Sequence, residues 1–445
     1  MTWSTEPDAV FARWLLLALA PAVLAAPLRW AVLAWLLMTN LDATGSGVAS
    51  HAGVGWLNAL KAVVLPAWLL VRLRRVPGSL HRNWASHCWL ALAVCAAGSA
   101  CWSPYPLAAV KLAVGMAAVL LALLGLERAA LGRGLDEATL RRFLLGSLAL
   151  ALVQSLGFAD GSFGYAGRGM PQRFTSFVAA QQFAALLTAM LCWLLWTPAM
   201  KETWRTVGVL VLFAALAANG SRTWTLGALV ALGLHAVLAR LRWPYLLRIV
   251  AAVAILASVP AIRRGVERRA AAEEPANRLT ATASALLKGR DRADGMGLGT
   301  ARFRMEMYRG VWGAMREGGL REWVLGRGVG SAAQVATAVF PRAYRPESLD
   351  VNRVVHNEWL RLSYELGLVG LGLFLAVIAG LARLAWEARS HPEGMALASY
   401  LPALLLGLTA ENVLDGAGNV VTSGLLVLIA CAARARAGGG GAVRT

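Results

Sequence analysis

The residues best suited to chemistry are one histidine and a set of arginines, which stand at the edges of apolar runs. His356 and Asn357 open the stretch HNEWLRLSYELGLVGLGLF (356–374), which we interpret as the start of a membrane-spanning helix over 357–384. Histidine changes charge near neutral pH and is therefore suited to act as a general base. A helix that begins here turns its positive end toward His356, which attracts anions and disfavours a positive charge on the imidazole.

The arginines that we expect on the same side of the membrane as His356 lie in three short stretches. These are Arg222 in NGSRTWTLG, Arg168 and Arg173 in GYAGRGMPQRFTSF, and Arg302, Arg304 and Arg309 in ARFRMEMYRGVWGAMREG. Guanidinium groups bind phosphate through paired hydrogen bonds and stay charged at physiological pH. Together with a histidine base, they predict transfer of a group from a lipid-linked phosphate to a hydroxyl. The alternatives for single residues are an interfacial anchor at Arg222 and an ordinary helix cap at His356.

Acidic residues that face the same side outside the long loop described below are few. Asp160, Glu411 and Asp415 fall on three separate turns, and the chain has no DxD pair, HExxH motif or carboxylate cluster. The five cysteines form no CxxC pair and are expected as small residues of apolar segments: Cys88, Cys95, Cys101, Cys192 and Cys431. We therefore expect no metal site and no cofactor.

A membrane domain must position these residues. The chain has 445 residues, of which 58% are hydrophobic and only 15% charged, and its mean hydropathy is +0.58. Soluble domains carry about a quarter charged residues, so the composition predicts an all-α polytopic integral membrane protein. Runs long enough to span a bilayer fall near 53–73, 86–102, 106–126, 141–159, 174–196, 205–219, 222–240, 243–261, 357–384, 396–411 and 417–433. The stretch 10–42, interrupted by Pro21 and Pro27, crosses once or forms a hairpin, and one crossing gives about twelve transmembrane helices.

Short basic loops give the expected orientation. On one face lie Arg72, Arg74, Arg75 and Arg82, then Arg128, Arg133, Arg141 and Arg142, then Lys201 and Arg205, Arg240 and Arg242, Arg383 and Arg389, and Arg434 and Arg436. The positive-inside rule makes this face cytoplasmic. Both termini are then cytoplasmic, whereas His356 and the arginines named first face outward.

The chain is expected to divide into N-terminal transmembrane helices (1–260), a large outer loop (261–355) and C-terminal transmembrane helices (356–445). The loop carries 17 Lys and Arg residues against 10 Asp and Glu, so it is either a binding surface for an anionic partner or a solvated charged surface. The net charge of +19 lies mostly in this loop and between apolar runs, which favours anionic lipid or substrate over nucleic acid.

Two patterns within the loop predict local structure. Phe303, Met307, Val311 and Met315 recur every fourth residue, which predicts an amphipathic helix over 301–318 that could lie on the membrane surface. The turn GRGVG (326–330) superficially matches a phosphate loop but lacks the following Lys-Ser/Thr pair, so we do not assign it that role.

Several motifs together resemble the O-antigen ligase and polymerase superfamily. HNEWLRLSYELGLVG is similar to its His-Asn-x-x-Leu segment followed by Glu-x-Gly-hydrophobic-x-Gly. SRTWTLGALVAL is similar to its Ser-Arg helix start, and RFRMEMY with VLGRGVGS to its Arg-x-x-x-aromatic helix and Gly-x-Gly turn. RFTSF is a weaker match to an earlier arginine segment. The order of the motifs and the single large loop before the histidine fit the same superfamily.

The resemblance implies a GT-C-like fold with a large helical periplasmic loop, in the bacterial inner membrane. It implies an O-antigen ligase that transfers O-antigen from undecaprenyl pyrophosphate to a sugar hydroxyl of lipid A–core, in lipopolysaccharide biosynthesis, by an inverting and metal-independent glycosyltransferase reaction. An O-antigen polymerase or a protein O-oligosaccharyltransferase of the same superfamily is the alternative.

The resemblance also implies roles for single residues. His356 matches the proposed catalytic base, and the arginines expected to bind the pyrophosphate are Arg222, Arg304 and Arg173. The segment between Tyr308 and Gly326 is a few residues longer than the superfamily pattern, so Arg302 or Arg309 could take the place of Arg304. The secondary candidates are therefore Asn357, Arg302, Arg309 and Arg168.

Two further classes of function stay open at this stage. A transporter or flippase for an anionic lipid or glycan would need charges in the middle of several spans and repeated architecture, whereas Lys61 is one of few such charges. A scaffold whose basic loop recruits partners would leave the outward arginines and His356 without a role.

Overall fold

The computed structural model of the protein describes residues 7–41, 60–158, 174–197, 200–239, 248–255, 296–339, 355–411, 413 and 420–439. Side chains are described throughout these ranges except at 296–303, 420–422 and 438–439. Within the ranges the chain forms helices and no strand, and an isolated parallel bridge joins Leu41 and Phe177. The predicted all-α class is therefore confirmed for this part of the chain.

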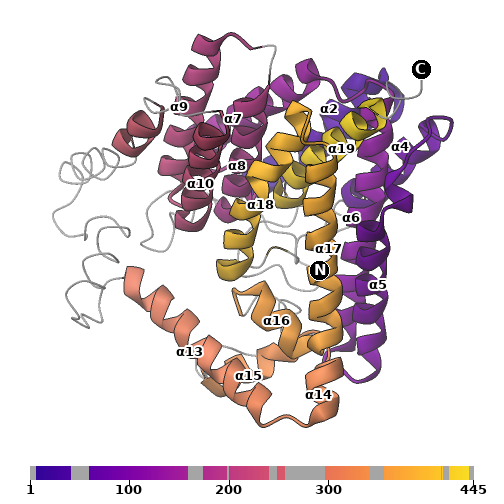
Figure 1. Ribbon diagram of the computed structural model, residues 1–445, viewed down its shortest axis with the longest axis vertical. Coiled ribbons are helices and arrows are strands. Elements are labelled where there is room, and N and C mark those ends of the chain that lie inside the picture. The colour runs from indigo at the N-terminus through magenta and orange to yellow at the C-terminus, as the bar shows by residue number, and fades with distance from the viewer. Residues whose placement is uncertain are drawn as a thin grey trace.

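The helices form an N-terminal and a C-terminal set (Figure 1). The first set comprises α1 (Pro7–Ala25), α2 (Leu28–Met38), η1 (Leu60–Val64), α4 (Leu65–Arg72), η2 (Leu80–Arg82), α5 (Trp84–Gly98), η3 (Ser99–Cys101), α6 (Pro106–Leu131), α7 (Glu137–Gly157), α8 (Ala180–Trp196), α9 (Glu202–Asn219) and α10 (Arg222–Leu238). The second comprises α13 (Met296–Arg316), α14 (Leu320–Leu325), α15 (Ala332–Val339), α16 (Glu358–Glu365), α17 (Gly367–Glu387), α18 (Pro392–Ala410) and α19 (Val420–Gly439).

Six helices within the described residues are long and apolar enough to cross a membrane: α1, α5 continued by η3, α6, α7, α17 and α18. Helices α2, α8 and α10 are apolar but shorter. These lengths and compositions are consistent with a polytopic membrane protein, as the composition predicts. About twelve crossings and a GT-C-like arrangement remain predictions, and most of the run 243–261 lies outside the described residues.

The stretch 10–42 forms two helices that separate at Pro27. This residue has no N–H to continue a helical hydrogen-bond ladder, and it is the N-cap of α2. Pro21, which we also expected to interrupt the stretch, lies inside α1, so that part of the prediction is wrong. Apolar helices tolerate an internal proline where neighbouring groups pack around it. Helices α1 and α2 contact each other, and α2 has only 11 residues.

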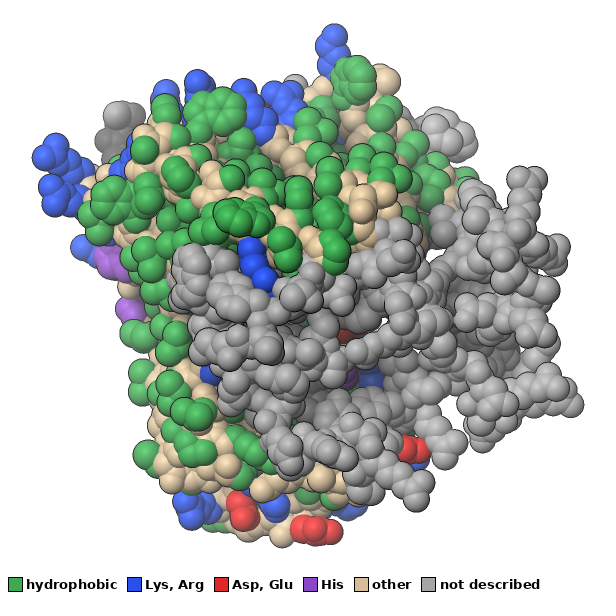
Figure 2. All heavy atoms as spheres, turned by 180° about the vertical axis from the view of Figure 1, so that it is seen from behind, with side chains coloured by type: hydrophobic (Ala, Val, Ile, Leu, Met, Phe, Trp, Pro, Cys, Tyr) green, Lys and Arg blue, Asp and Glu red, His purple; other side chains and the backbone are tan. Residues whose placement is uncertain are grey.

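The main core is organised around α8. Every residue from Phe183 to Leu195 is buried, and α8 contacts α9, α10, α18 and α19. The outer faces of α5, α6 and α7 instead expose apolar side chains, among them Leu90, Val94, Leu107, Val114, Leu145 and Leu152. Apolar side chains cover much of the described surface (Figure 2), as expected of a surface that contacts lipid.

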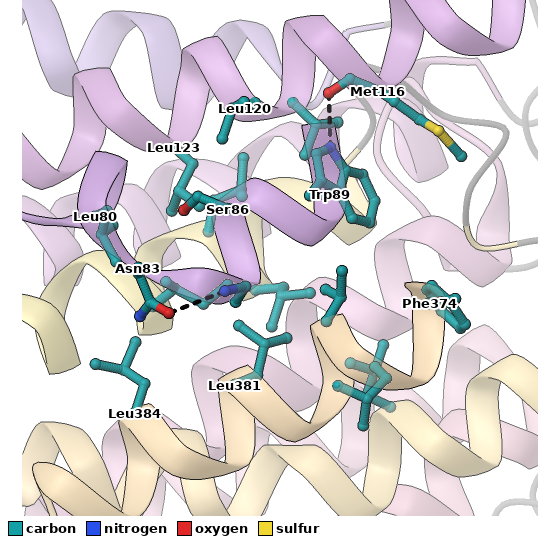
Figure 3. A pocket seen from close by; sticks show the side chains of 18 of the residues that line it. Leu80, Asn83, Ser86, Trp89, Met116, Leu120, Leu123, Phe374, Leu381 and Leu384 are labelled. Atoms are coloured by element: carbon teal, nitrogen blue, oxygen red, sulfur yellow. Dashed lines mark hydrogen bonds between the residues drawn. The ribbon is translucent and has the colours of Figure 1, made fainter. Parts of the chain in front are cut away.

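An apolar cavity lies between α5, α6, α17, α18 and α19 (Figure 3). Its lining extends from Leu80 and Asn83 to Met116 and Phe374. Trp89 donates its indole N–H to the Met116 carbonyl at 2.7 Å, so this polar atom is used within the protein. Nearly all lining groups are aliphatic or aromatic, and the cavity therefore supplies no acid, base or cation for catalysis.

The prediction of a single membrane helix over 357–384 is wrong. The chain instead forms two helices, α16 and α17, which meet at an elbow at Gly367. Gly367 has φ +65°, in the left-handed region that favours glycine. A Cβ on this residue would collide with the Val324 carbonyl group, so a second segment of the chain approaches the elbow closely. The helix direction therefore changes because of a tertiary contact.

The segment that holds the elbow is the glycine-rich turn 326–330. The Gly328 N–H donates to the Glu365 carbonyl at 2.8 Å. On its other side, the turn accepts a hydrogen bond from Ser103 Oγ to the Val329 carbonyl at 2.6 Å. The turn thus fastens the α16–α17 elbow to the connection between α5 and α6, which is a structural role.

Helices α13 to α16 gather around a second, smaller core at one end of the molecule (Figure 1). The amphipathic helix predicted over 301–318 is confirmed as α13. Its Met307, Val311 and Met315 side chains are buried in this core together with Tyr364 of α16. The apolar stripe of α13 therefore faces the interior of the protein.

The opposite end is rich in Lys and Arg, which gather at the top of Figure 2, where α4, α6, α17 and α19 finish. We call this the basic end. Arg436 of α19 pairs with Glu387 of α17 at 3.1 Å, so the basic C-terminal tail lies beside the predicted basic loop that contains Arg383 and Arg389. The short basic loops within the described residues are thus separated from helices α13 to α16, which contain the long loop's described part.

Candidate functional site

The candidate site lies at the C-terminal end of α18, a helix that packs against α10 and α16 and that Arg304 and Tyr308 of α13 contact. Two contacts show that α10 runs antiparallel to α18: Gly407 lies against the Trp224 ring, and Gly227 lies against Ala403. A Cβ on either glycine would come within 2.8 Å of its neighbour, so these two helices are closely packed. This register places Arg222, the first residue of α10, level with the last turn of α18.

Helix α13 presents Arg304 and Tyr308 to this end of α18, since a spacing of four residues puts both on one helix face. Arg304 Nη2 lies 3.5 Å from Oε1 of Glu411, the residue that follows α18. The two side chains are 24% and 13% exposed, so the pair is partly shielded from water. Arg304 Nε makes no hydrogen bond to the described residues. The Arg304 guanidinium group is therefore only partly satisfied within the described part of the protein.

Tyr308 connects three elements of the site. Its hydroxyl oxygen lies 2.9 Å from the carbonyl oxygen of His356 and 3.3 Å from that of Thr409, so it can donate to either carbonyl group. Burial raises the pKa of Tyr308 above its usual value, against the opposing effect of the Arg304 charge. The hydroxyl is therefore protonated at neutral pH and acts as a donor.

His356 precedes α16 and does not begin it, which corrects the expected helix start. Asn357 is the N-cap, and its side chain accepts a hydrogen bond from the Leu360 N–H at 3.0 Å. Helix α16 begins at Glu358. His356 has φ +52°, in the left-handed region, which costs a residue with a Cβ on the order of 1 kcal/mol. The surrounding contacts must hold this residue in place.

Helix α16 buries a charged face that the sequence analysis missed. Glu358, Arg361 and Glu365 are at most 1% exposed, and Arg361 Nη2 lies 2.8 Å from Glu358 Oε2. Placing charged side chains in lipid costs free energy, which explains why α16 is not the start of a membrane span. The sequence contained a signal for this charged face, because Glu358, Arg361 and Glu365 stand at positions i, i+3 and i+7, which share one helix face.

The structure brings several predicted site residues together. His356, Asn357 and Arg304 all interact with Tyr308, and Arg222 begins a helix at the same end of the molecule. Sequence reasoning placed Tyr308 only in a motif and gave it no role. The Arg304-x-x-x-Tyr308 spacing was the signal that could have identified it.

Other predicted residues lie elsewhere. Arg309 is exposed on α13, one position beyond Tyr308. Arg302 belongs to the backbone of α13, but its side chain is outside the description. Wholly outside the described residues lie Asp160, Arg168, Arg173 and Asp415. Among the α13 candidates with a described side chain, Arg304 is the one that contacts the end of α18.

The chemical capacity of the site follows from its donors. In the described part of the chain, no group of three or more His, Cys, Asp or Glu side chains could hold a metal ion. Glu411 is the acidic residue that faces Arg304. The site combines the Arg304 guanidinium group with a nearby histidine, residue types that suit reactions that release a phosphate-type leaving group.

The described residues form helices, and the long apolar helices among them are consistent with a polytopic membrane protein. Residues 207–375, less than half of the chain, match a family model described as O-Antigen ligase. This segment includes Arg222, Arg304 and His356 and confirms the predicted family. The chain thus contains a segment similar to the O-antigen ligase family, whose members are glycosyltransferase-like ligases and polymerases. No curated protein matches the chain.

Proposed function

We propose that the protein is an O-antigen ligase that transfers O-antigen from undecaprenyl pyrophosphate to a sugar hydroxyl of lipid A–core, at the periplasmic face of the inner membrane. The observation that carries this proposal is the meeting of Arg304 and the His356 peptide at the end of α18, beside the start of α10 at Arg222. These three residues lie within the family domain, and members of the family in general use a lipid-linked glycan and a lipid acceptor.

In the proposed reaction, one C–O bond forms and one breaks. The acceptor hydroxyl oxygen attacks the anomeric carbon of the glycan from the face opposite the pyrophosphate, which inverts that carbon. His356 removes the hydroxyl proton, and the pyrophosphate departs with the electron pair of the broken bond. Arg304 and Arg222 stabilise the charge that develops on the departing oxygen.

Arg304 suits this role because it is permanently charged, partly buried and loosely paired. Its 3.5 Å contact with Glu411 is longer than the roughly 2.7–2.9 Å of a strong charge-assisted hydrogen bond. A pyrophosphate group can therefore compete with the Glu411 carboxylate for the guanidinium. Partial exclusion of water would strengthen the attraction between the Arg304 guanidinium and a bound pyrophosphate.

The location of the short basic loops at the end opposite the candidate site supports a periplasmic site. Short loops rich in Lys and Arg stay in the cytoplasm when a membrane protein inserts, and the described loops of this kind gather at the basic end. The end that holds α13 to α16 then faces the periplasm. A basic long loop on that side is compatible with the rule, because long loops translocate largely regardless of charge.

Cysteine labelling tests this orientation in a background without the native cysteines. A cysteine in place of Leu320, which is 81% exposed on α14, should react with an impermeant thiol reagent in intact spheroplasts. A cysteine in place of Arg133, between α6 and α7, should react only after the membrane is permeabilised. The reverse pattern would place the site in the cytoplasm.

The experiment that tests the function uses the purified full-length protein, undecaprenyl-pyrophosphate glycan and lipid A–core, with products separated on a gel. Formation of lipopolysaccharide by wild-type protein and none by His356→Ala would support the ligase. Growth of the donor-linked glycan without lipid A–core would identify a polymerase instead. Transfer to a pilin would identify a protein O-oligosaccharyltransferase, and no transfer to any acceptor would overturn the glycosyltransferase proposal.

A further inference from the structure

We propose that Tyr308 is a positioning residue of this site, whose hydroxyl group holds the His356 peptide and thereby keeps the imidazole in place for turnover. The role of His356 itself rests on the proposed function. The hold on its peptide is a property of the structure, and it can be measured without any substrate.

The geometry places the Tyr308 hydroxyl between two carbonyl groups that belong to different parts of the chain. It lies 2.9 Å from the carbonyl oxygen of His356 and 3.3 Å from that of Thr409. A hydroxyl has one proton to donate, so the shorter contact, to His356, is the main hydrogen bond. The Tyr308 side chain thus connects α13 both to His356, which precedes the N-cap of α16, and to Thr409 in the last turn of α18.

His356 needs such a hold because of its backbone conformation. Its φ of +52° lies in a region that residues with a Cβ rarely adopt. Asn357 fixes the following part of the chain, since its side chain caps α16 through the Leu360 N–H. Tyr308 fixes the His356 carbonyl group. Relaxation of this peptide to a commoner conformation would move the imidazole, because the side-chain direction follows the backbone.

The hydroxyl can be removed without releasing α13 from the protein. Met307, Val311 and Met315 anchor the same helix in the core that it shares with α15 and α16, and the Tyr308 ring packs against that core. Phenylalanine keeps the ring and loses only the hydroxyl. Tyr308→Phe therefore tests the hydrogen bond rather than the folding of the helix.

The same contacts argue for positioning over direct participation in the reaction. The proton of the Tyr308 hydroxyl is used by a backbone carbonyl group within the protein. Burial, the largest influence, raises the pKa of this hydroxyl, so the group does not ionise near neutral pH. Such a hydroxyl is a poor acid or base for a substrate, and its effect on turnover must pass through His356.

The experiment compares full-length wild-type, Tyr308→Phe and Tyr105→Phe proteins in the same detergent. Tyr105, which precedes α6, packs against the same core and controls for the loss of a tyrosine hydroxyl. Hydrogen–deuterium exchange of peptides that cover 355–361 should be several-fold faster in Tyr308→Phe only. In the ligation assay, kcat of Tyr308→Phe should fall about tenfold, as expected for one lost hydrogen bond, with KM for the donor within twofold.

Each outcome decides the proposal. Unchanged exchange over 355–361 in Tyr308→Phe would overturn the hold on His356. Faster exchange with unchanged kcat would overturn its link to turnover, and a raised donor KM at unchanged kcat would make Tyr308 a donor-binding residue instead. If wild-type protein forms no lipopolysaccharide, the proposed function fails, and the exchange measurement alone decides whether Tyr308 holds His356.

Discussion

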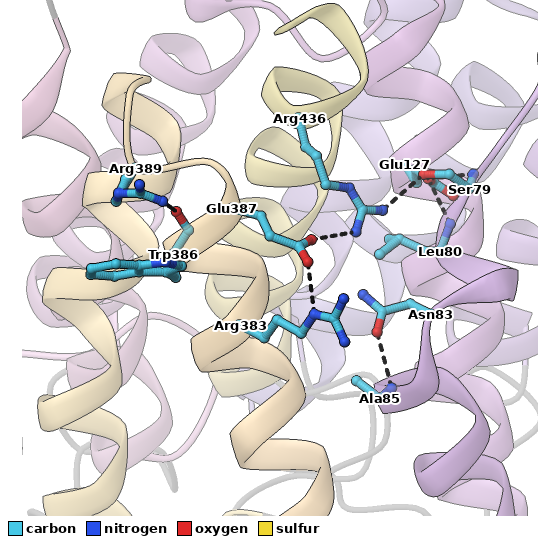
Figure 4. Close-up of polar contacts among 10 residues, drawn as sticks. All are labelled: Ser79, Leu80, Asn83, Ala85, Glu127, Arg383, Trp386, Glu387, Arg389 and Arg436. Atoms are coloured by element: carbon cyan, nitrogen blue, oxygen red, sulfur yellow. Dashed lines mark hydrogen bonds and ion pairs between the residues drawn. The ribbon is translucent and has the colours of Figure 1, made fainter. Parts of the chain in front are cut away.

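The two ends of the molecule both carry arginines, but the protein holds them in different ways. At the basic end, Arg436 pairs with Glu387 at 3.1 Å through one nitrogen and donates to Ser79 Oγ at 3.2 Å through another (Figure 4). At the candidate site, Arg304 has a longer contact of 3.5 Å with Glu411. The first arginine joins helices through two short contacts, whereas the second makes a longer contact and is the one proposed to bind a ligand.

The carboxylates at the two ends differ in the same way. Glu127 is buried at the basic end, and its Oε1 accepts hydrogen bonds from the Ser79 N–H, the Ser79 hydroxyl and the Leu80 N–H at 2.7, 2.9 and 2.8 Å. Glu411 is partly exposed and faces Arg304 at a longer distance. The completed bonding of Glu127 within the protein indicates a structural role.

The largest expected effect belongs to His356. His356→Ala should lower kcat/KM for ligation by roughly 10²–10⁴-fold, because a general base is lost, and should leave the melting temperature unchanged. His356→Gln should be equally inactive, since glutamine keeps polarity without basicity. The matched control is His391→Ala at the N-cap of α18, which should keep wild-type activity. Activity within threefold of wild type in well-expressed His356→Ala protein would exclude the base.

Lysine substitutions test the contrast between the arginines. Arg304→Lys and Arg222→Lys should each slow ligation by about 10- to 100-fold, because lysine keeps the charge but loses the planar donor fork. Arg383→Lys at the basic end should stay within twofold, since its side chain is 71% exposed and surface ion pairs contribute little. Initial rates of lipopolysaccharide formation by equal amounts of protein measure all three.

Two results would revise this contrast. Full activity of Arg222→Lys would make Arg222 an interfacial anchor rather than a phosphate ligand. A silent Arg304→Ala together with an inactive Arg309→Ala would place the donor on the exposed face of α13.

At Glu127 the expected effect is on stability and not on turnover. Glu127→Gln replaces a buried charged acceptor of three hydrogen bonds, which should reduce stability by roughly 1–3 kcal/mol. The melting temperature in detergent should fall by several degrees, with kcat per folded protein unchanged. A specific loss of kcat at wild-type stability would contradict the proposed division of the molecule into a structural end and a catalytic end.

Sequence patterns predicted the elements whose side chains repeat with a clear period. The fourfold spacing that includes Met307 and Val311 predicted α13, and both side chains are buried in its core. The same kind of reasoning failed over 357–384, because hydropathy is averaged over a window, whereas the elbow depends on the single residue Gly367. At Gly367 the chain changes direction and lies close to the Val324 carbonyl group, which is far away in sequence. Tertiary contacts of this kind leave no local pattern.

The residue types of the site were predictable, but their contacts were not. The resemblance selected Arg304 and His356, and the structure places both around Tyr308. The bond from Tyr308 to the His356 carbonyl group could not be predicted, because backbone carbonyl groups are present at every position. Glu411 was visible only as an isolated acid, since its partner Arg304 is far away in the chain.

The smallest expected effect is that of a chelator. Many enzymes neutralise a phosphate leaving group with a divalent ion held by carboxylates. Within the described residues, Glu411 pairs with Arg304 and no metal-binding cluster forms, while Arg304 and Arg222 supply charge that persists across physiological pH. The purified protein should therefore form lipopolysaccharide in excess EDTA within twofold of the rate without it. Loss of activity that Mg²⁺ or Mn²⁺ restores would instead reveal a carboxylate site, which Glu411→Ala and Asp415→Ala would locate.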